Sequence, residues 1–84
     1  MTSPAHGMSK RLEACTSWTL TRDGHVLTCT LLQRSPHTYV VRLEVGGRRI
    51  LDELCDTPHH AVARSLDALG ALLARGWLVR GTAN

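Results

Sequence analysis

The stretch Cys15–Leu32 reads CTSWTLTR-DG-HVLTCTLL and decides the start of the fold. Two runs of alternating β-prone residues flank Asp23-Gly24, the dipeptide that favours a two-residue type I′ turn because both of its central positions need a positive φ. The stretch therefore predicts a β-hairpin. Pairing about the turn places these residues opposite one another: Arg22 and His25, Leu20 and Leu27, Trp18 and Cys29, Thr16 and Leu31.

This register sorts the hairpin into two faces of different chemistry. The apolar face holds Trp18, Leu20, Leu27, Cys29 and Leu31. The hydroxyl-rich face holds Ser17, Thr19, Thr21, Thr28 and Thr30, together with Val26. A shift of one residue would mix the two sets, so the pattern fixes the expected pairing.

A second hairpin is predicted over Thr38–Val45, Gly46-Gly47 and Arg48–Leu54, after a break at Ser35-Pro36-His37. Pairing about the glycines predicts the partners Leu43 and Ile50, Val41 and Asp52, and Glu44 and Arg49. One face then holds Tyr39, Val41, Leu43, Val45, Ile50 and Leu54. The other face holds Val40, Arg42, Glu44, Leu51 and Glu53.

A helix is predicted from Thr57-Pro58, an N-cap followed by proline at the first helical position, to Arg75, with Gly76 just beyond its end. Residues at helical spacing predict a core stripe of Val62, Leu66, Leu69 and Leu73, flanked by Ala61, Ser65 and Leu72. A second helix face has little bulk and holds Ala63, Asp67, Gly70 and Ala74.

These elements predict an α+β fold: a four-stranded antiparallel meander of two hairpins, with one C-terminal helix packed on one face, in the order β-β-β-β-α. Trp77, Leu78 and Val79 either fold back on the core or add a short fifth strand at 77–80. We expect residues 1–11 to form a flexible leader, 12–80 a single domain, and 81–84 a disordered tail. The sequence leaves open whether translation starts at Met1 or at Met8. The expected core holds Trp18, Leu20, Leu27, Cys29, Leu31, Leu43 and Ile50 against the helix stripe.

Composition excludes a disordered chain and a membrane span, because 43 % of the 84 residues are apolar and no uncharged apolar stretch is long enough. The net charge of +3 is scattered along the chain. Three cysteines without CxxC spacing do not suggest a disulfide framework, and the N-terminal residues have no apolar signal-peptide core. We therefore expect a soluble cytoplasmic protein.

One cluster carries potential metal or redox ligands: Cys55, His59 and His60 lie around the predicted helix N-terminus. The helix dipole would favour a thiolate at Cys55, and cysteine and histidine are natural zinc ligands. However, adjacent histidines in a helix project about 100° apart, which disfavours their binding one ion. Histidines in a structural or solvent-facing role are the better expectation.

No catalytic signature is present, since the sequence has no GxSxG motif, no phosphate-binding loop and no GxGxxG motif. We expect no catalytic residues, no cofactor and no enzyme activity. Single-stranded nucleic-acid binding is the main alternative function, because Arg42, Arg48 and Arg49 lie on the second hairpin with Tyr39 nearby.

From Trp18 to Trp77 the layout resembles a type of short uncharacterised bacterial protein. The shared features are the alternating hairpin, the segment Gly-Gly-Arg-Arg-Ile-Leu, the Thr-Pro helix start and the closing Arg-Gly-Trp. The order β-β-β-β-α is also similar to that of single-strand-binding transcriptional coactivators, which dimerise and bind DNA on their sheets. Their lysine-rich aromatic surface has no counterpart here, since Lys10 is the only lysine.

The function expected from these features is binding of a macromolecular partner, as a homodimer formed through a sheet edge or the small-residue helix face. One helix covers only one face of the sheet, and the other face is more apolar than a solvated face requires. The candidate interface residues are Val26, Leu32, Val40 and Leu51 on the sheet and Ala63, Gly70 and Ala74 on the helix.

Overall fold

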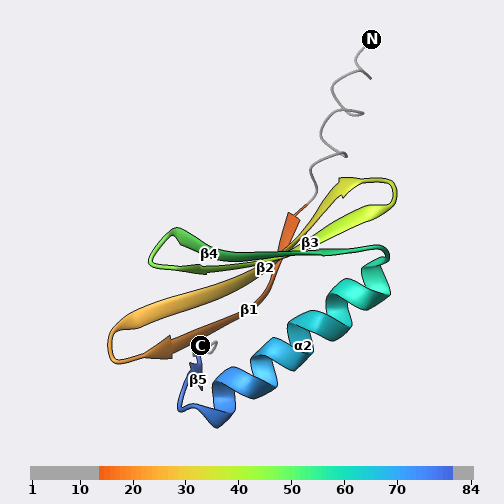
Figure 1. Ribbon diagram of the computed structural model, residues 1–84. Helices are drawn as coiled ribbons and strands as arrows, with labels where there is room; N and C mark the ends of the chain where they lie inside the picture. Colours follow the sequence, from red (N-terminus) through yellow and green to blue (C-terminus); the bar gives the residue numbers. More distant parts are fainter. Residues whose placement is uncertain (1–13, 81–84) are drawn as a thin grey trace.

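Two glycine turns organise the chain into an antiparallel meander, as the sequence predicts. The computed structural model describes residues 14–80; the predicted leader, Met8 and the predicted tail lie outside this range. Five strands form one sheet in the order β4-β3-β2-β1-β5, with a helix on one face (Figure 1). The elements are β1 Ala14–Arg22, β2 His25–Ser35, β3 Thr38–Val45, β4 Arg48–Cys55, α2 Pro58–Ala74 and β5 Leu78–Val79. The α+β architecture is therefore confirmed.

Both hairpin turns have the backbone that their residues favour. Asp23 and Gly24 have φ values of 50° and 83°, and Gly46 and Gly47 have φ values of 60° and 86°. Two successive positive φ angles are the signature of a type I′ turn, whose twist matches that of the flanking strands. The turn chemistry therefore sets where each hairpin reverses.

The β1–β2 register agrees with the prediction near the turn and departs from it further away. The predicted partners of Arg22, Leu20 and Trp18 are all observed. The register then shifts between Thr16 and Trp18, so Thr16 lies opposite Thr30 and not opposite Leu31 as predicted. Such a β-bulge inserts one extra residue into one strand.

The extra residue, Ser17, is not among the hydroxyl side chains of the far face, where the sequence pattern placed it. Its Oγ lies 3.4 Å from the Oγ of Ser65 on α2. The bulge therefore brings Ser17 to the side of the sheet that the helix covers.

A second bulge changes the faces of β4. The predicted pair of Glu44 and Arg49 is observed, but the register then shifts. Leu43 lies opposite Leu51 and not opposite Ile50, and Val41 lies opposite Glu53 and not opposite Asp52. Val40 lies opposite Leu54.

Directly paired residues share a face, so the bulge exchanges two predicted sets. Leu51 and Glu53 share a face with Leu43 and Val41, whereas Leu54 belongs to the opposite face. Ile50, which we expected in the core, is 56 % exposed.

Helix α2 begins and ends as its capping residues predict. The side chain of Thr57 accepts a hydrogen bond from the backbone N–H of His60 at 3.0 Å, and Pro58 occupies the first turn. At the other end, Gly76 has a φ of 101°, and the N–H of Trp77 donates to the carbonyl of Leu72. These contacts form the Schellman motif, which satisfies carbonyls at the helix end and turns the chain back towards the sheet.

The helix is rotated from the orientation that the apolar stripe predicts. Ala61 and Ser65 are buried against the sheet. Three of the four stripe residues are substantially exposed: Val62 at 45 %, Leu66 at 55 % and Leu73 at 41 %. The prediction that this stripe fills the core is therefore wrong.

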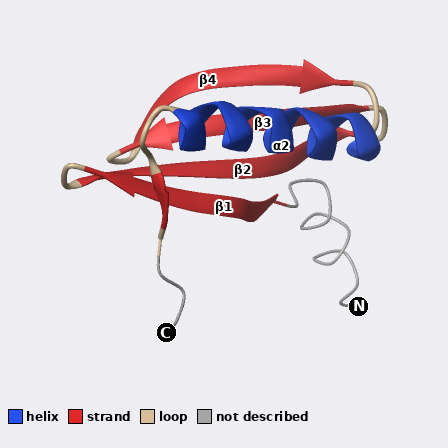
Figure 2. Ribbon diagram, turned by 90° about the horizontal axis from the view of Figure 1, so that it is seen from below, coloured by secondary structure: helices blue, strands red, loops and turns tan. Residues whose placement is uncertain are grey.

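The rotation places small side chains beneath the first half of the helix. Trp18 reaches up from β1 and donates from Nε1 to the backbone carbonyl of Ser65 at 3.0 Å. Ala61 and Ser65 face the sheet there, and Leu72 packs against the core nearer the end of α2. Figure 2 shows α2 running across the sheet in front of β3, with β1 left to one side.

The core under the helix comes mainly from β2 and β3. Cys29, Leu27 and Leu43 are buried with Val41, and Cys55 and Ala61 complete the cluster; Trp18, Leu31, Tyr39, Leu72 and Trp77 pack against it. Among the described residues, no helix is long and apolar enough to cross a membrane.

The short strand β5 confirms the fifth strand that the sequence left as one of two options. Leu78 and Val79 pair with Thr21 and Leu20, and the N–H of Arg80 donates to the carbonyl of Thr19 at 2.9 Å. The C-terminal segment therefore covers only the end of β1 near the first turn.

The rotated helix gives a prediction for stability. Leu27→Ala should lower the free energy of unfolding by about 2–5 kcal/mol, because Leu27 is 3 % exposed and truncation leaves a cavity. Leu66→Ala, the matched substitution on the exposed side of α2, should lower it by less than about 1 kcal/mol. Urea unfolding of dilute protein measures both values. Equal losses would show that Leu66 lies in the core after all.

Candidate functional site

One side of helix α2 presents a largely apolar surface to solvent, with the exposed Asp67 at its border. Val62, Leu66 and Leu73 are exposed to the extents given above, and between them lie three small residues that are also exposed: Ala63, Gly70 and Ala74. We call these six residues the apolar half of α2. Large contiguous apolar surfaces on small domains commonly mark contact sites.

Gly70 lies in the middle of this surface without a structural reason inside the chain. A Cβ atom built at Gly70 meets no heavy atom within 4 Å. Glycine in a helix interior is less favourable than alanine by roughly 0.5–1 kcal/mol. Internal packing of the described residues therefore does not require glycine at this position.

The two edges of the sheet differ in charge. Strand β4 is one edge and carries four charged residues, a common protection against unwanted strand pairing: Arg48, Arg49, Asp52 and Glu53. On the other edge, β5 pairs only with Leu20 and Thr21, so within residues 14–80 the segment Ala14–Trp18 has no strand on its outer side. This free segment has no charged residue.

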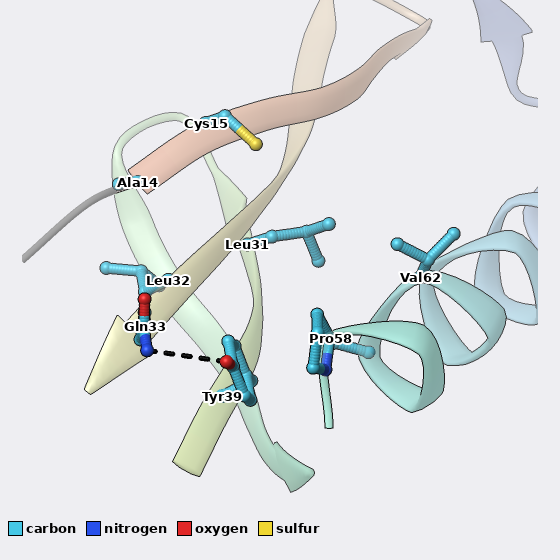
Figure 3. A pocket seen from close by; sticks show the side chains of 9 residues that line it. Ala14, Cys15, Leu31, Leu32, Gln33, Tyr39, Pro58 and Val62 are labelled. Carbon is cyan, nitrogen blue, oxygen red and sulfur yellow. Dashed lines mark hydrogen bonds between the residues drawn. The ribbon is translucent and has the colours of Figure 1, made fainter. Parts of the chain in front are cut away.

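A cavity of about 380 Å³ opens between this free segment and the first turns of α2. Leu31 and Cys15 form its sheet side, and Pro58, Ala61 and Val62 form its helix side (Figure 3). The cavity exists because Ala61 and not a larger residue faces the sheet here, and because α2 leaves β1 uncovered.

The polar groups of the cavity belong to two neighbouring strands. Gln33 donates from Nε2 to the hydroxyl of Tyr39 at 3.3 Å and to the carbonyl of Ser35 at 3.2 Å (Figure 3). In this arrangement the Oε1 of Gln33 can accept a hydrogen bond, and the hydroxyl hydrogen of Tyr39 can be donated. The nine residues that line the cavity include no acid, no arginine, no lysine and no histidine.

The three cysteines differ in exposure and in pKa. Cys15 is exposed and lines the cavity, whereas Cys29 and Cys55 are buried, and all three are free thiols. Burial, with a smaller effect of the neighbouring Cys15, raises the pKa of Cys29 to about 11. Burial and the nearby carboxylate of Glu53 also raise the pKa of Cys55.

The candidate metal or redox cluster is not assembled. Cys55 is buried at the end of β4, whereas His59 and His60 are exposed on the first turn of α2. Within the described part of the chain, no group of three histidine, cysteine or acidic residues is placed to hold a metal ion. The expectation that the pKa of Cys55 is lowered is wrong in direction, because burial and Glu53 raise it.

The arginines of the second hairpin are paired with an acid. Arg42 donates to both carboxylate oxygens of Asp52, at 2.9 and 3.1 Å, and Arg49 lies 3.5 Å from the same carboxylate. The hydrogen bond from Arg42 holds the pKa of Asp52 below its usual value. Arg48 is exposed beside the Gly46-Gly47 turn.

Tyr39 lies apart from these arginines. It shares the helix-covered face with Val41 and Leu43, whereas Arg42 belongs to the opposite face. The structure therefore does not bring the four nucleic-acid candidates together on one surface.

The sheet residues named as interface candidates have different environments. Val26 and Leu32 are half-buried, Val40 is only 2 % exposed, and Leu51 is exposed but belongs to the helix-covered face. The sequence pattern missed Leu54, which is 60 % exposed on the opposite face, because the bulge in β4 cannot be seen from alternation. The helix candidates Ala63, Gly70 and Ala74 are all exposed, as described above.

Comparisons of the chain with protein-family models, with curated proteins and with solved structures gave no match. The surfaces formed by the chain's own residues therefore carry the functional proposal.

The different thiol environments give a second prediction. Iodoacetamide at about pH 8 should modify Cys15 in the folded protein, while Cys29 and Cys55 should react only after unfolding, because alkylation needs an accessible thiolate. Mass spectrometry of intact and digested protein measures the number and position of the modified residues. Rapid labelling of Cys55 in folded protein would contradict its placement and reopen a redox role.

Proposed function

We propose that this protein is a small non-catalytic protein-binding module that acts as a homodimer through the apolar half of α2. The observation that carries the proposal is the exposure of three large apolar side chains, Val62, Leu66 and Leu73, on one side of α2. When another surface covers large apolar residues that face water, the free energy of the protein falls, so association is favoured.

Two features favour a second copy as the partner. Each copy carries a formal charge of +3, so self-association needs a contact surface without like charges, and the six residues of the apolar half have none. Gly70, with open space above it, would allow a second helix backbone to approach closely. Ala63, Leu66, Gly70 and Leu73 follow the 3-4 spacing of a helix-packing seam, with small and large residues in alternation.

Single-stranded nucleic-acid binding is less well supported. Asp52 holds both Arg42 and Arg49, which reduces the positive potential they offer to a phosphate. Tyr39, the only aromatic residue among the candidates, lies on the other face of the sheet. A metal or redox role at the helix N-terminus has the same difficulty, since Cys55 is buried away from the two exposed histidines.

The dimer is tested by sedimentation at up to about 100 μM protein, where interfaces of modest area assemble. Wild-type protein should sediment as a dimer. Leu66→Glu should weaken association by about ten-fold or more, because a carboxylate would have to be buried at the interface.

The matched control is Leu54→Glu, which changes a leucine of similar exposure on the opposite face of the sheet and should leave the dimer intact. A monomeric wild-type protein would overturn the homodimer. A dimer that Leu54→Glu breaks and Leu66→Glu does not would move the interface to the sheet.

Gly70→Ala gives an independent prediction, because its effects on the monomer and the dimer have opposite signs. The monomer should become more stable by roughly 0.5–1 kcal/mol, since alanine is the better helix former and its Cβ meets no neighbour. The dimer should become weaker, since the added methyl separates the two helices. Thermal unfolding of dilute protein and sedimentation of concentrated protein measure the two effects. A stabilised monomer with unchanged association would show that Gly70 lies outside the interface.

A further inference from the structure

We propose that the cavity between β1, β2 and the first turns of α2 binds a small uncharged molecule with an apolar body and one hydroxyl group, such as an alcohol or a phenol. The inference does not depend on dimer formation: only Val62 belongs to both the cavity lining and the apolar half of α2, and binding is measured on dilute protein, where a dimer dissociates.

The size of the cavity limits the ligand. Its volume of about 380 Å³ lies in the range of small-molecule sites in proteins. At roughly 30 Å³ for each non-hydrogen atom of a liquid, the cavity holds a molecule of about ten to thirteen such atoms. A ten-carbon alcohol fits this limit.

The lining determines the chemistry of the body and the head. Leu31, Pro58, Ala61 and Val62 offer apolar walls to an aliphatic or aromatic body. A hydroxyl head needs one acceptor for its hydrogen and one donor for its oxygen. The pair of Gln33 and Tyr39 supplies one of each, through the free Oε1 of the amide and the free hydrogen of the phenol.

The absence of charge in the lining distinguishes an alcohol from the corresponding acid. Among residues 14–80, no cationic side chain lines the cavity, so a carboxylate there would lose hydration without gaining an ion pair from them. An alcohol loses less on leaving water and recovers its hydrogen bonds. The site should therefore prefer the neutral head at equal chain length.

Cys15 provides a native reporter of occupancy. It lines the cavity, it is exposed, and the other two cysteines are buried. A molecule in the cavity should shield the Cys15 thiol and slow its alkylation. The protection should saturate with the same concentration dependence as binding.

The test measures displacement of the neutral fluorescent probe 1-naphthol, which is within the size limit of the cavity, from dilute protein by 1-decanol and by decanoate, together with the rate of Cys15 alkylation. Decanol should displace the probe and slow the alkylation, and decanoate should be about ten-fold weaker or more, as expected for the burial of an unpaired charge. Decanol that neither displaces the probe nor protects Cys15 would overturn the proposal.

A matched pair of variants places the binding on α2. Val62→Trp should fill the cavity and weaken decanol binding by about ten-fold or more, as expected when the ligand loses its space. Leu73→Trp introduces the same side chain at an exposed position near the other end of the helix and should leave binding unchanged. Circular dichroism confirms that both variants are folded.

Equal loss in both variants, or loss in Leu73→Trp alone, would show that the probe binds the exposed side of the helix and not the cavity. Equal affinity for decanol and decanoate would overturn the assigned head group. Because sedimentation reports the dimer separately, failure here leaves the proposed function untouched.

Discussion

The docking of Ser65 against the sheet is the constraint on which the rest of the structure depends. Ser65 is fully buried, its Oγ donates to the carbonyl of Val62 at 2.9 Å, and its own carbonyl accepts from the indole of Trp18. Two contacts reach Ser65 from β1, the indole of Trp18 at its carbonyl and the hydroxyl of Ser17 beside its Oγ, and because buried polar groups need partners, these contacts fix the rotation of α2 and not merely its position. With Ala61 and Ser65 turned inward, Val62, Leu66 and Leu73 face outward. The surface that we propose for partner binding is thus a consequence of how the helix is held.

The features that depend on local chemistry were predictable from the sequence, and those that depend on this docking were not. Asp23-Gly24, Thr57-Pro58 and Gly76 each act on their immediate neighbours, and the turns and helix ends follow from them. The bulge at Ser17 has a distant cause, because its side chain reaches α2 across nearly fifty residues of sequence. Alternation of residue types cannot reveal an inserted residue whose partner comes from another element.

The apolar stripe of the helix is a second feature that the sequence pattern placed incorrectly. Helical periodicity correctly placed α2, but it gave the greatest weight to the largest apolar side chains. Where Trp18, Leu27 and Leu43 already fill the sheet surface, the helix contributes the small residues Ala61 and Ser65. The candidate site was therefore predicted in part: the small residues of α2 were identified, but the leucines beside them were assigned to the core. The cavity could not be predicted, because it arises where the small side chain of Ala61, and not a larger one, faces the sheet.

The second attachment of α2 explains why the exposed side and the cavity both lie towards β1. Arg64 donates to Glu53 on β4 at 2.8 Å and also lies 3.3 Å from Asp67, so an ion pair ties the opposite flank of the helix to the charged edge of the sheet. Glu53 reaches this flank only because the bulge at Ile50 turns it to the helix-covered face.

The ion pair of Arg64 holds one flank of the helix, and Ser65 holds the side that faces the sheet. Among the described residues, none attaches the apolar half of α2 in this way. A surface fixed by hydrogen bonds on its far sides is already ordered before a partner arrives, which reduces the entropy lost on binding. In a chain of this size, which buries a limited fraction of its surface, covering the apolar half by association would add stability through mass action. The same contacts that expose the apolar half of α2 therefore also prepare it for binding.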